Sequence, residues 1–205
     1  MTKMNNWPTH QGNNQRNGIT TQRLSLPMNE RWTYISTHAP RPAWPPPARK
    51  DPWHRHPKLN PRVVFDRAYH VVSDGKSAFF ASSADEKIYC LDAENGQEKW
   101  SFFTEGPVRL APTIHDDKVY VGSDDGVVYC LKSENGDPVW KYRSLIEDRR
   151  IPGNQRIISN TPVRTGVLIE NGIAYFCTGL FPNEGVKMVA LNSDDGTEVW
   201  VRSHK

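Results

Sequence analysis

The sequence has no run of about 18 apolar residues, so it contains no segment that could form a transmembrane helix. The opening residues, MTKMNNWPTHQGNN, lack the apolar core of a secretory signal peptide. The Gly-x-Ser-x-Gly, phosphate-loop and HExxH patterns are also absent, which removes the sequence signals for three large classes of enzyme. Only three cysteines occur, with no CxxC pair or metal-ligand spacing. We expect Cys90, Cys130 and Cys177 to be small buried side chains.

Charge is distributed unevenly along the 205 residues. Residues 1–66 carry ten Lys and Arg against three Asp and Glu, whereas residues 67–205 carry 16 against 20. A basic segment can indicate nucleic-acid binding. Here the basic residues are scattered among prolines and tryptophans rather than along one helix face, so we expect no nucleic-acid partner.

A short phrase that ends in tryptophan occurs three times. It reads YCLDAENGQEKW at 89–100, YCLKSENGDPVW at 129–140 and VALNSDDGTEVW at 189–200. The first two tryptophans are 40 residues apart and the last two are 60 apart. Extra residues after Trp140 and near 179–185 account for the longer spacing. The chain is therefore a repeat protein with enlarged loops in its third unit.

Within each unit the apolar residues alternate with period two, which predicts β-strands. In the second unit we expect strands at about 109–114, 118–123, 127–131 and 138–143, joined by tight turns at Asp-Asp and Asn-Gly. Four antiparallel strands repeated about every 40 residues are typical of a β-propeller, in which each repeat forms one blade.

The remaining segments complete the predicted layout. ERWTYIS at 30–36 resembles the fourth strand of a unit and would close a ring, while the prolines of 37–62 exclude helix and interior strand. The predicted parts are a leader with the ring-closing strand (1–36), a proline-rich insertion (37–62), blade 1 (63–103), blade 2 (104–143), an inserted loop (144–160) and blade 3 (161–205).

Three blades are fewer than the four to eight of a complete propeller. We therefore expect an incomplete ring, part of a seven- or eight-bladed propeller, which is completed by further blades or by self-association.

The closing phrase resembles the tryptophan-docking motif of PQQ-type, quinoprotein alcohol dehydrogenase-like propeller repeats, Ala-x-Asp-x-x-Thr-Gly-x-x-x-Trp. The chain is identified as a member of this family, close to its BamB-like bacterial proteins. The glycine suits a left-handed turn position, and the tryptophan is expected to dock between neighbouring blades. The motif positions are Gly96, Trp100, Gly136, Trp140, Gly196 and Trp200.

The resemblance implies two alternative functions. One is a non-catalytic scaffold that binds a protein or an acidic ligand in the cell envelope or periplasm, without a cofactor. The other is a fragment of a quinoprotein dehydrogenase, an oxidoreductase that would need PQQ and a calcium ion. The vicinal Cys-Cys pair of quinoprotein alcohol dehydrogenases does not occur in the sequence, and no calcium ligand set can be matched. The scaffold is the favoured interpretation, and the absent signal peptide leaves the compartment of this chain open.

Arginine recurs at the start of each unit, at Arg67, Arg109 and Arg164. The first strand of a propeller blade lines the central channel. These side chains could form an anion site or an acidic-partner site at the channel mouth. Alternatively, each arginine pairs with an acid or a carbonyl of a neighbouring blade.

Two long loops form a second candidate surface. Trp44 and Trp53 lie in the proline-rich insertion, and Arg149 and Arg150 lie in the inserted loop. Exposed aromatic residues, prolines and arginines are typical of protein recognition. The alternative is that both loops only brace the ring.

Two metal-like patterns are better explained as loops. SDDG at 123–126 has calcium-binding chemistry but coincides with an expected hairpin turn. His54 and His56 are two residues apart, yet no third ligand for zinc or copper is evident. We therefore predict no metal site.

Overall fold

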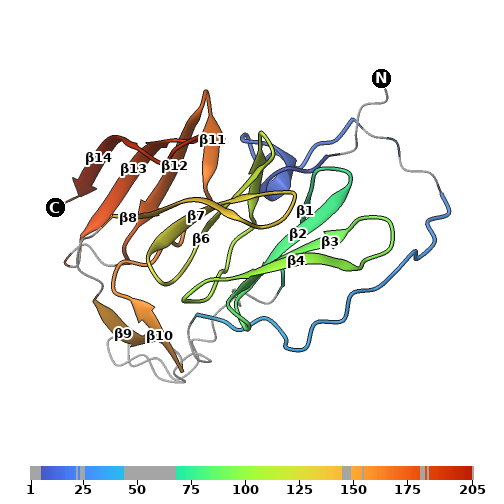
Figure 1. Ribbon diagram of the computed structural model, residues 1–205, viewed down its shortest axis with the longest axis horizontal. Helices are drawn as coiled ribbons and strands as arrows, with labels where there is room; N and C mark the ends of the chain where they lie inside the picture. The colour runs from blue at the N-terminus through green and yellow to red at the C-terminus, as the bar shows by residue number, and fades with distance from the viewer. Residues whose placement is uncertain are drawn as a thin grey trace, which may run out of the picture.

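The computed structural model describes residues 6–21, 23, 26–43, 68–144, 149–153, 155–180, 183 and 185–204. These residues form 14 strands and one short 3-10 turn, η1 (His10–Gly12). Twelve of the strands form three four-stranded antiparallel sheets that stand side by side in chain order (Figure 1). The predicted all-β propeller architecture, with about three blades, is confirmed.

Each sheet is one blade, and its strands follow one another in sequence order. Blade 1 contains β1 (Val72–Ser73), β2 (Ser77–Ser82), β3 (Lys87–Asp92) and β4 (Glu98–Phe103). Blade 2 contains β5 (Thr113–His115), β6 (Lys118–Gly122), β7 (Val127–Lys132) and β8 (Pro138–Arg143). Blade 3 contains β11 (Leu168–Glu170), β12 (Ile173–Thr178), β13 (Val186–Asn192) and β14 (Glu198–His204).

The three blades share local detail as well as strand order. The pairing of the third and fourth strands shifts register once in every blade, at the same place in the repeat. The shifts lie at Cys90/Leu91, Cys130/Leu131 and Ala190/Leu191. Such a bulge bends the fourth strand relative to the third.

Two apolar cores join the blades. One core contains Phe79, Trp100 and Val119, so it lies between blades 1 and 2. The other contains Tyr120, Trp140 and Leu191, so it lies between blades 2 and 3. The hydrophobic burial that stabilises each blade therefore comes mainly from its neighbour.

The outer face of blade 1 is covered by the segment before it. Trp32, Tyr34 and Tyr69 pack against a third cluster that includes Phe80 and Tyr89. The structure assigns no strand to 30–36. A ring-closing strand would pair with a further blade, so the ring-closing role of this segment stays a prediction.

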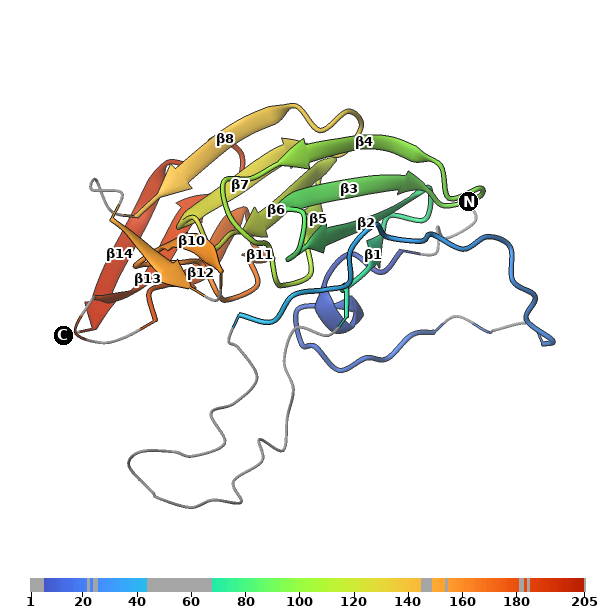
Figure 2. The ribbon, with the colours of Figure 1, turned by 90° about the horizontal axis from the view of Figure 1, so that it is seen from below.

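The N-terminal leader runs past the innermost strands of all three blades. The backbones of Trp7 and Ser73 of β1 exchange two hydrogen bonds, of 2.7 and 2.9 Å. Ile114 of β5 donates its N–H to the carbonyl of Pro8 at 2.7 Å. The Asn14 amide donates to a backbone carbonyl of β11 at 2.8 Å. The leader thus satisfies polar groups on strand edges that the sheets leave unpaired, and Figure 2 shows η1 beside β1.

The inserted loop contains a hairpin that the sequence analysis missed, formed by β9 (Arg150–Gly153) and β10 (Arg156–Ser159). It lies at the end of the sheets near the light-blue segment that leads to residue 43 (Figure 1). The first strands are also shorter than expected, since β5 begins at Thr113 rather than near 109. Among the described residues, no helix has the length and apolarity that a membrane span requires.

Candidate functional site

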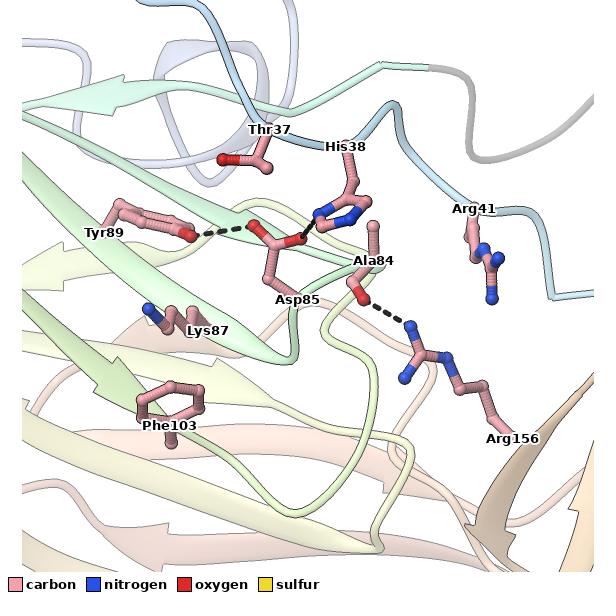
Figure 3. A pocket seen from close by; sticks show the side chains of 9 residues that line it. All are labelled: Thr37, His38, Arg41, Ala84, Asp85, Lys87, Tyr89, Phe103 and Arg156. Atoms are coloured by element: carbon pink, nitrogen blue, oxygen red, sulfur yellow. Dashed lines mark hydrogen bonds and ion pairs between the residues drawn. The ribbon is translucent and has the colours of Figure 1, made fainter.

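A hollow of about 400 Å³, which we call the basic hollow, lies where three separate segments meet (Figure 3). Residues 37–41 form one wall, and the β2–β3 loop with the adjoining ends of β3 and β4 forms another. Arg156 of the β9–β10 hairpin forms the third wall. Because these segments are distant in the sequence, only the folded chain brings them together.

Among the described residues, Asp85 supplies the one carboxylate that lines the basic hollow, and it already has hydrogen-bond partners. Its Oδ2 accepts a hydrogen bond of 2.7 Å from the Tyr89 hydroxyl, and its Oδ1 lies 3.1 Å from Nδ1 of His38. Burial is the main cause that raises the pKa of Tyr89, and the bond to Asp85 raises it further. Tyr89 therefore remains a neutral donor over the physiological pH range.

Arg41 and Lys87 line the basic hollow without a carboxylate partner among the described residues. The Lys87 ammonium lies 4.3 Å from the centre of the Phe103 ring and 5.6 Å from that of Tyr89. The faces of these rings attract the cation but do not neutralise it. The Phe103 side chain is 68% exposed. The basic hollow is therefore cationic and has an exposed aromatic wall.

The β9–β10 hairpin reaches across blade 2 to blade 1. Arg156 donates from Nη1 to the Glu86 carboxylate at 3.0 Å, and from Nη2 to the carbonyl of Ala84. Arg150 donates from Nη2 to the Glu105 carboxylate at 2.8 Å. These contacts agree with a bracing role for the described part of the inserted loop.

The predicted channel arginines meet on one buried carboxylate. Arg109 Nε lies 2.6 Å from Oδ2 of Asp124, and Arg164 Nε lies 2.8 Å from Oδ1. The Asp124 side chain is 1% exposed. We call these three residues the Asp124 clamp. Both arginines precede the first strand of their blade instead of opening it, so their predicted placement is wrong.

The Asp124 clamp holds connections from two blades. The Asp124 N–H donates to the carbonyl of Pro107 at 2.9 Å, and its carbonyl accepts from the Ser159 N–H at 2.8 Å. Arg109 also donates from Nη1 to the carbonyl of Arg41 at 2.7 Å. The clamp therefore connects both blade junctions with residue 41 at the basic hollow.

The neighbouring Asp125 is buried within the turn formed by SDDG at 123–126, whose acids resemble calcium ligands. Its carboxylate accepts hydrogen bonds from the Tyr129 hydroxyl at 2.5 Å and from the N–H groups of Glu105 and Val127 at 2.9 and 2.8 Å. Burial raises the pKa of Asp125, and these bonds oppose the shift. The acids of SDDG thus serve turn structure and inter-blade contacts.

A second cavity of about 300 Å³ lies between the leader and the start of blades 2 and 3. Its lining includes His10, Arg16, Thr113 and Arg164. Burial, followed by the charges of His70 and Arg16, lowers the pKa of His10. His10 is therefore neutral over most of the physiological pH range.

The motif glycines and tryptophans pair across blade boundaries. A Cβ built on Gly96, Gly136 or Gly196 would come within 2.5–2.7 Å of a tryptophan ring, and each of these glycines has a φ of 73–76°. The rings belong to the motif residues Trp100 and Trp140 and to Trp32 of the leader. The third motif tryptophan, Trp200, has Tyr175 and Arg202 beside its ring.

Most of the other residues that the sequence analysis named lie outside the described part of the chain. Arg67, Trp44, Trp53, His54 and His56 lie outside the described residues. Arg149 is exposed, and its carbonyl accepts from the N–H of Asn160.

All three cysteines are free thiols, and Cys90 and Cys130 are buried. Burial raises the pKa of Cys90 to about 11 and that of Cys130 to about 12. Across the described ranges, His, Cys, Asp and Glu side chains form no group of three or more that could hold a metal ion.

A family model described as "Outer membrane protein assembly factor BamB" matches residues 46–204. A europium-containing methanol dehydrogenase has a similar fold, with a TM-score of 0.54 and 14% identity over 66% of this chain and 25% of that chain. The quinohemoprotein alcohol dehydrogenase ADHIIG from Pseudomonas putida HK5 gives 0.54 and 16%, over 69% and 21%. The enzyme from Comamonas testosteroni gives 0.53 and 16%, over 65% and 20%.

The chain thus spans a quarter or less of the length of these enzymes, and at such identities the likeness shows the fold alone. The comparison with curated proteins gives no match.

Proposed function

Because the chain belongs to the BamB-like family of PQQ-type propeller repeat proteins, we propose that it is a non-catalytic scaffold that binds a protein partner. The binding face is the end of the blades that carries the β9–β10 hairpin and the basic hollow. Further blades or a second copy of the chain complete the ring, and the family resemblance favours the bacterial periplasm or cell envelope as its compartment.

One observation carries the proposal. Arg41 and Lys87 face a hollow beside the exposed Phe103 ring, without a carboxylate partner among the described residues. Four other arginines of this face are paired with carboxylates of the chain: Arg150 with Glu105, Arg156 with Glu86, and Arg109 and Arg164 with Asp124. Uncompensated cations beside an exposed aromatic ring are typical of a recognition surface.

The similar folds of the alcohol dehydrogenases favour a second candidate, part of a PQQ-dependent dehydrogenase. Calcium needs six to eight oxygen ligands, including carboxylates. The buried acids among the described residues are Asp124 and Asp125. Two guanidinium groups, a hydroxyl and backbone N–H groups already bind their carboxylate oxygens. The described residues therefore do not fit calcium-bound PQQ, and the scaffold is the stronger candidate.

An absorption spectrum tests the two candidates against each other. The purified chain is incubated with PQQ and calcium, and free quinone is removed by gel filtration. The scaffold proposal expects no retained quinone and no dye-linked oxidation of alcohols. One equivalent of retained quinone, together with alcohol oxidation, would overturn it.

A further inference from the structure

We propose that the basic hollow binds an extended peptide segment of a partner protein in which acidic and apolar residues alternate. This inference rests on the proposed scaffold function and adds the chemistry of the partner. It depends on three features of the hollow: its two cations without a carboxylate partner among the described residues, its exposed Phe103 ring, and its assembly from three segments of the chain.

The charge of the basic hollow favours a carboxylate ligand. Arg41 and Lys87 supply two cations without a carboxylate partner among the described residues, whereas Arg156 is paired with Glu86. The Asp85 carboxylate in the lining already interacts with Tyr89. Figure 3 shows the Lys87 and Arg156 side chains on opposite sides of Asp85. An acidic side chain that enters the hollow would interact with Arg41 and Lys87, which have no carboxylate partner among the described residues. Charge-assisted hydrogen bonds of this kind are the strong ones.

Arg156 also contributes an unsatisfied donor. Its Nη1 and Nη2 are bonded to blade 1, but its Nε is buried and has no hydrogen-bond partner among the described residues. Buried polar groups in proteins usually have a partner. Because this nitrogen is buried, a ligand in the open hollow does not reach it, and an enclosed water is the acceptor that fits. The attraction of the hollow for an acidic ligand therefore depends on Arg41 and Lys87.

An apolar side chain stands next to these cations. Phe103, in the hollow wall, is 68% exposed. In an extended peptide, successive side chains point in opposite directions. A peptide with alternating acidic and apolar residues can therefore present carboxylates to the cations and apolar groups to the surface beside them.

The rest of the chain argues against a long polyanion in this place. Residues 67–205 carry 20 acidic and 16 basic residues, so the blade region as a whole is acidic. A long nucleic acid would meet repulsion beyond the basic hollow, whereas a short acidic segment needs only the local cations. The observations therefore favour a peptide, and the other anionic ligands serve as competing outcomes of the test.

Fluorescence anisotropy with a labelled peptide of alternating glutamate and leucine tests the proposal on the full chain. Binding should weaken as salt is added, because exposed ion pairs are screened. Arg41→Gln and Lys87→Gln should each raise the Kd about two- to fivefold, as expected for a partly exposed ion pair. Lys87→Arg should restore most of the affinity, and Phe103→Ala should weaken binding at any salt concentration.

Lys132→Gln is the matched control. Lys132 is an exposed lysine at the far end of β7, so its loss changes net charge equally but should leave the Kd unchanged. Thermal melts identify any variant that has lost its fold, and conclusions rest on the variants that melt like the parent chain.

Several results would overturn the proposal: a Kd that the Arg41 and Lys87 variants leave unchanged, equal binding of a peptide with glutamine in place of glutamate, or displacement of the peptide by inorganic phosphate or phosphatidylglycerol vesicles. If the peptide fails to bind while no PQQ is retained, the acidic-peptide site is wrong and the scaffold function stands. Retained PQQ with catalytic turnover would contradict the scaffold itself.

Discussion

The indole ring of Trp100 lies directly against Gly136, so closely that a Cβ on the glycine would be 2.7 Å from the ring carbon Cε3. The indole N–H donates to the carbonyl of Ser133 at 2.9 Å. Trp140 makes the same contact with blade 3, donating to Ser193 at 3.0 Å. The repeated phrase in the sequence therefore encodes a contact between successive blades.

Replacement of Gly136 tests this contact. Gly136→Ala should destabilise the protein by about 1–3 kcal/mol more than Gly172→Ala, because the new methyl group overlaps the Trp100 ring. Gly172 has a similar φ of 73°, but a Cβ there would meet nothing within 4 Å, so it isolates the cost of backbone strain. Denaturant unfolding measures both variants, and equal losses would show that the ring contact is unimportant.

The Asp124 clamp should be a major contributor to stability. Asp124→Asn removes a buried charge that neutralises Arg109 and Arg164, and we expect a loss of about 3–5 kcal/mol. Glu105→Gln, which breaks the exposed pair with Arg150, should cost less than about 1 kcal/mol. Urea unfolding compares the two variants. A loss below 1 kcal/mol for Asp124→Asn would mean that the clamp is not structural and would reopen an anion-binding role for the two arginines.

The thiols should be unreactive in the native protein. With a pKa of about 11, Cys90 is a thiolate in only about one molecule in a thousand at pH 8, and its burial blocks access as well. Ellman's reagent should label the native chain slowly, at Cys177 first, and all three thiols in guanidinium. Rapid native labelling of Cys90 or Cys130 would contradict the burial of β3 and β7.

The same shift predicts a loss of stability at alkaline pH. The folded pKa of Cys90, about 11, exceeds its ordinary value of 9.0. Between these two values the unfolded chain has released the proton that the folded chain retains, so stability falls as pH rises. Cys90→Ala should reduce this slope in urea titrations across the interval. An unchanged slope would exclude Cys90 as its source.

The architecture can be predicted from the sequence because each repeat contains its own short-range patterns. The Gly-to-Trp spacing and the period-two strands locate the blades, and the fold requires little else. In the segment at 30–36, Trp32 resembles a fourth-strand tryptophan. It occupies the docking position on Gly96 and donates to the carbonyl of Ala93. No strand is assigned there, because the strand that it would pair with belongs to a further blade.

The basic hollow could not be predicted in the same way. Arg41, Lys87 and Arg156 come from the leader side, from blade 1 and from the inserted hairpin, and no spacing in the sequence connects them. The arginines that the repeat does mark, Arg109 and Arg164, are instead occupied by Asp124. A repeat in the sequence marks residues that recur from blade to blade, whereas the residues of the basic hollow do not recur.

The most direct test of the binding scaffold is amide shift mapping by NMR with the glutamate-leucine peptide. We expect shifts confined to residues 36–43, the β2–β3 loop, the end of β4 around Phe103 and the hairpin around Arg156. Shifts centred on β14 or on the Asp124 clamp, with the basic hollow unchanged, would contradict the proposed binding face.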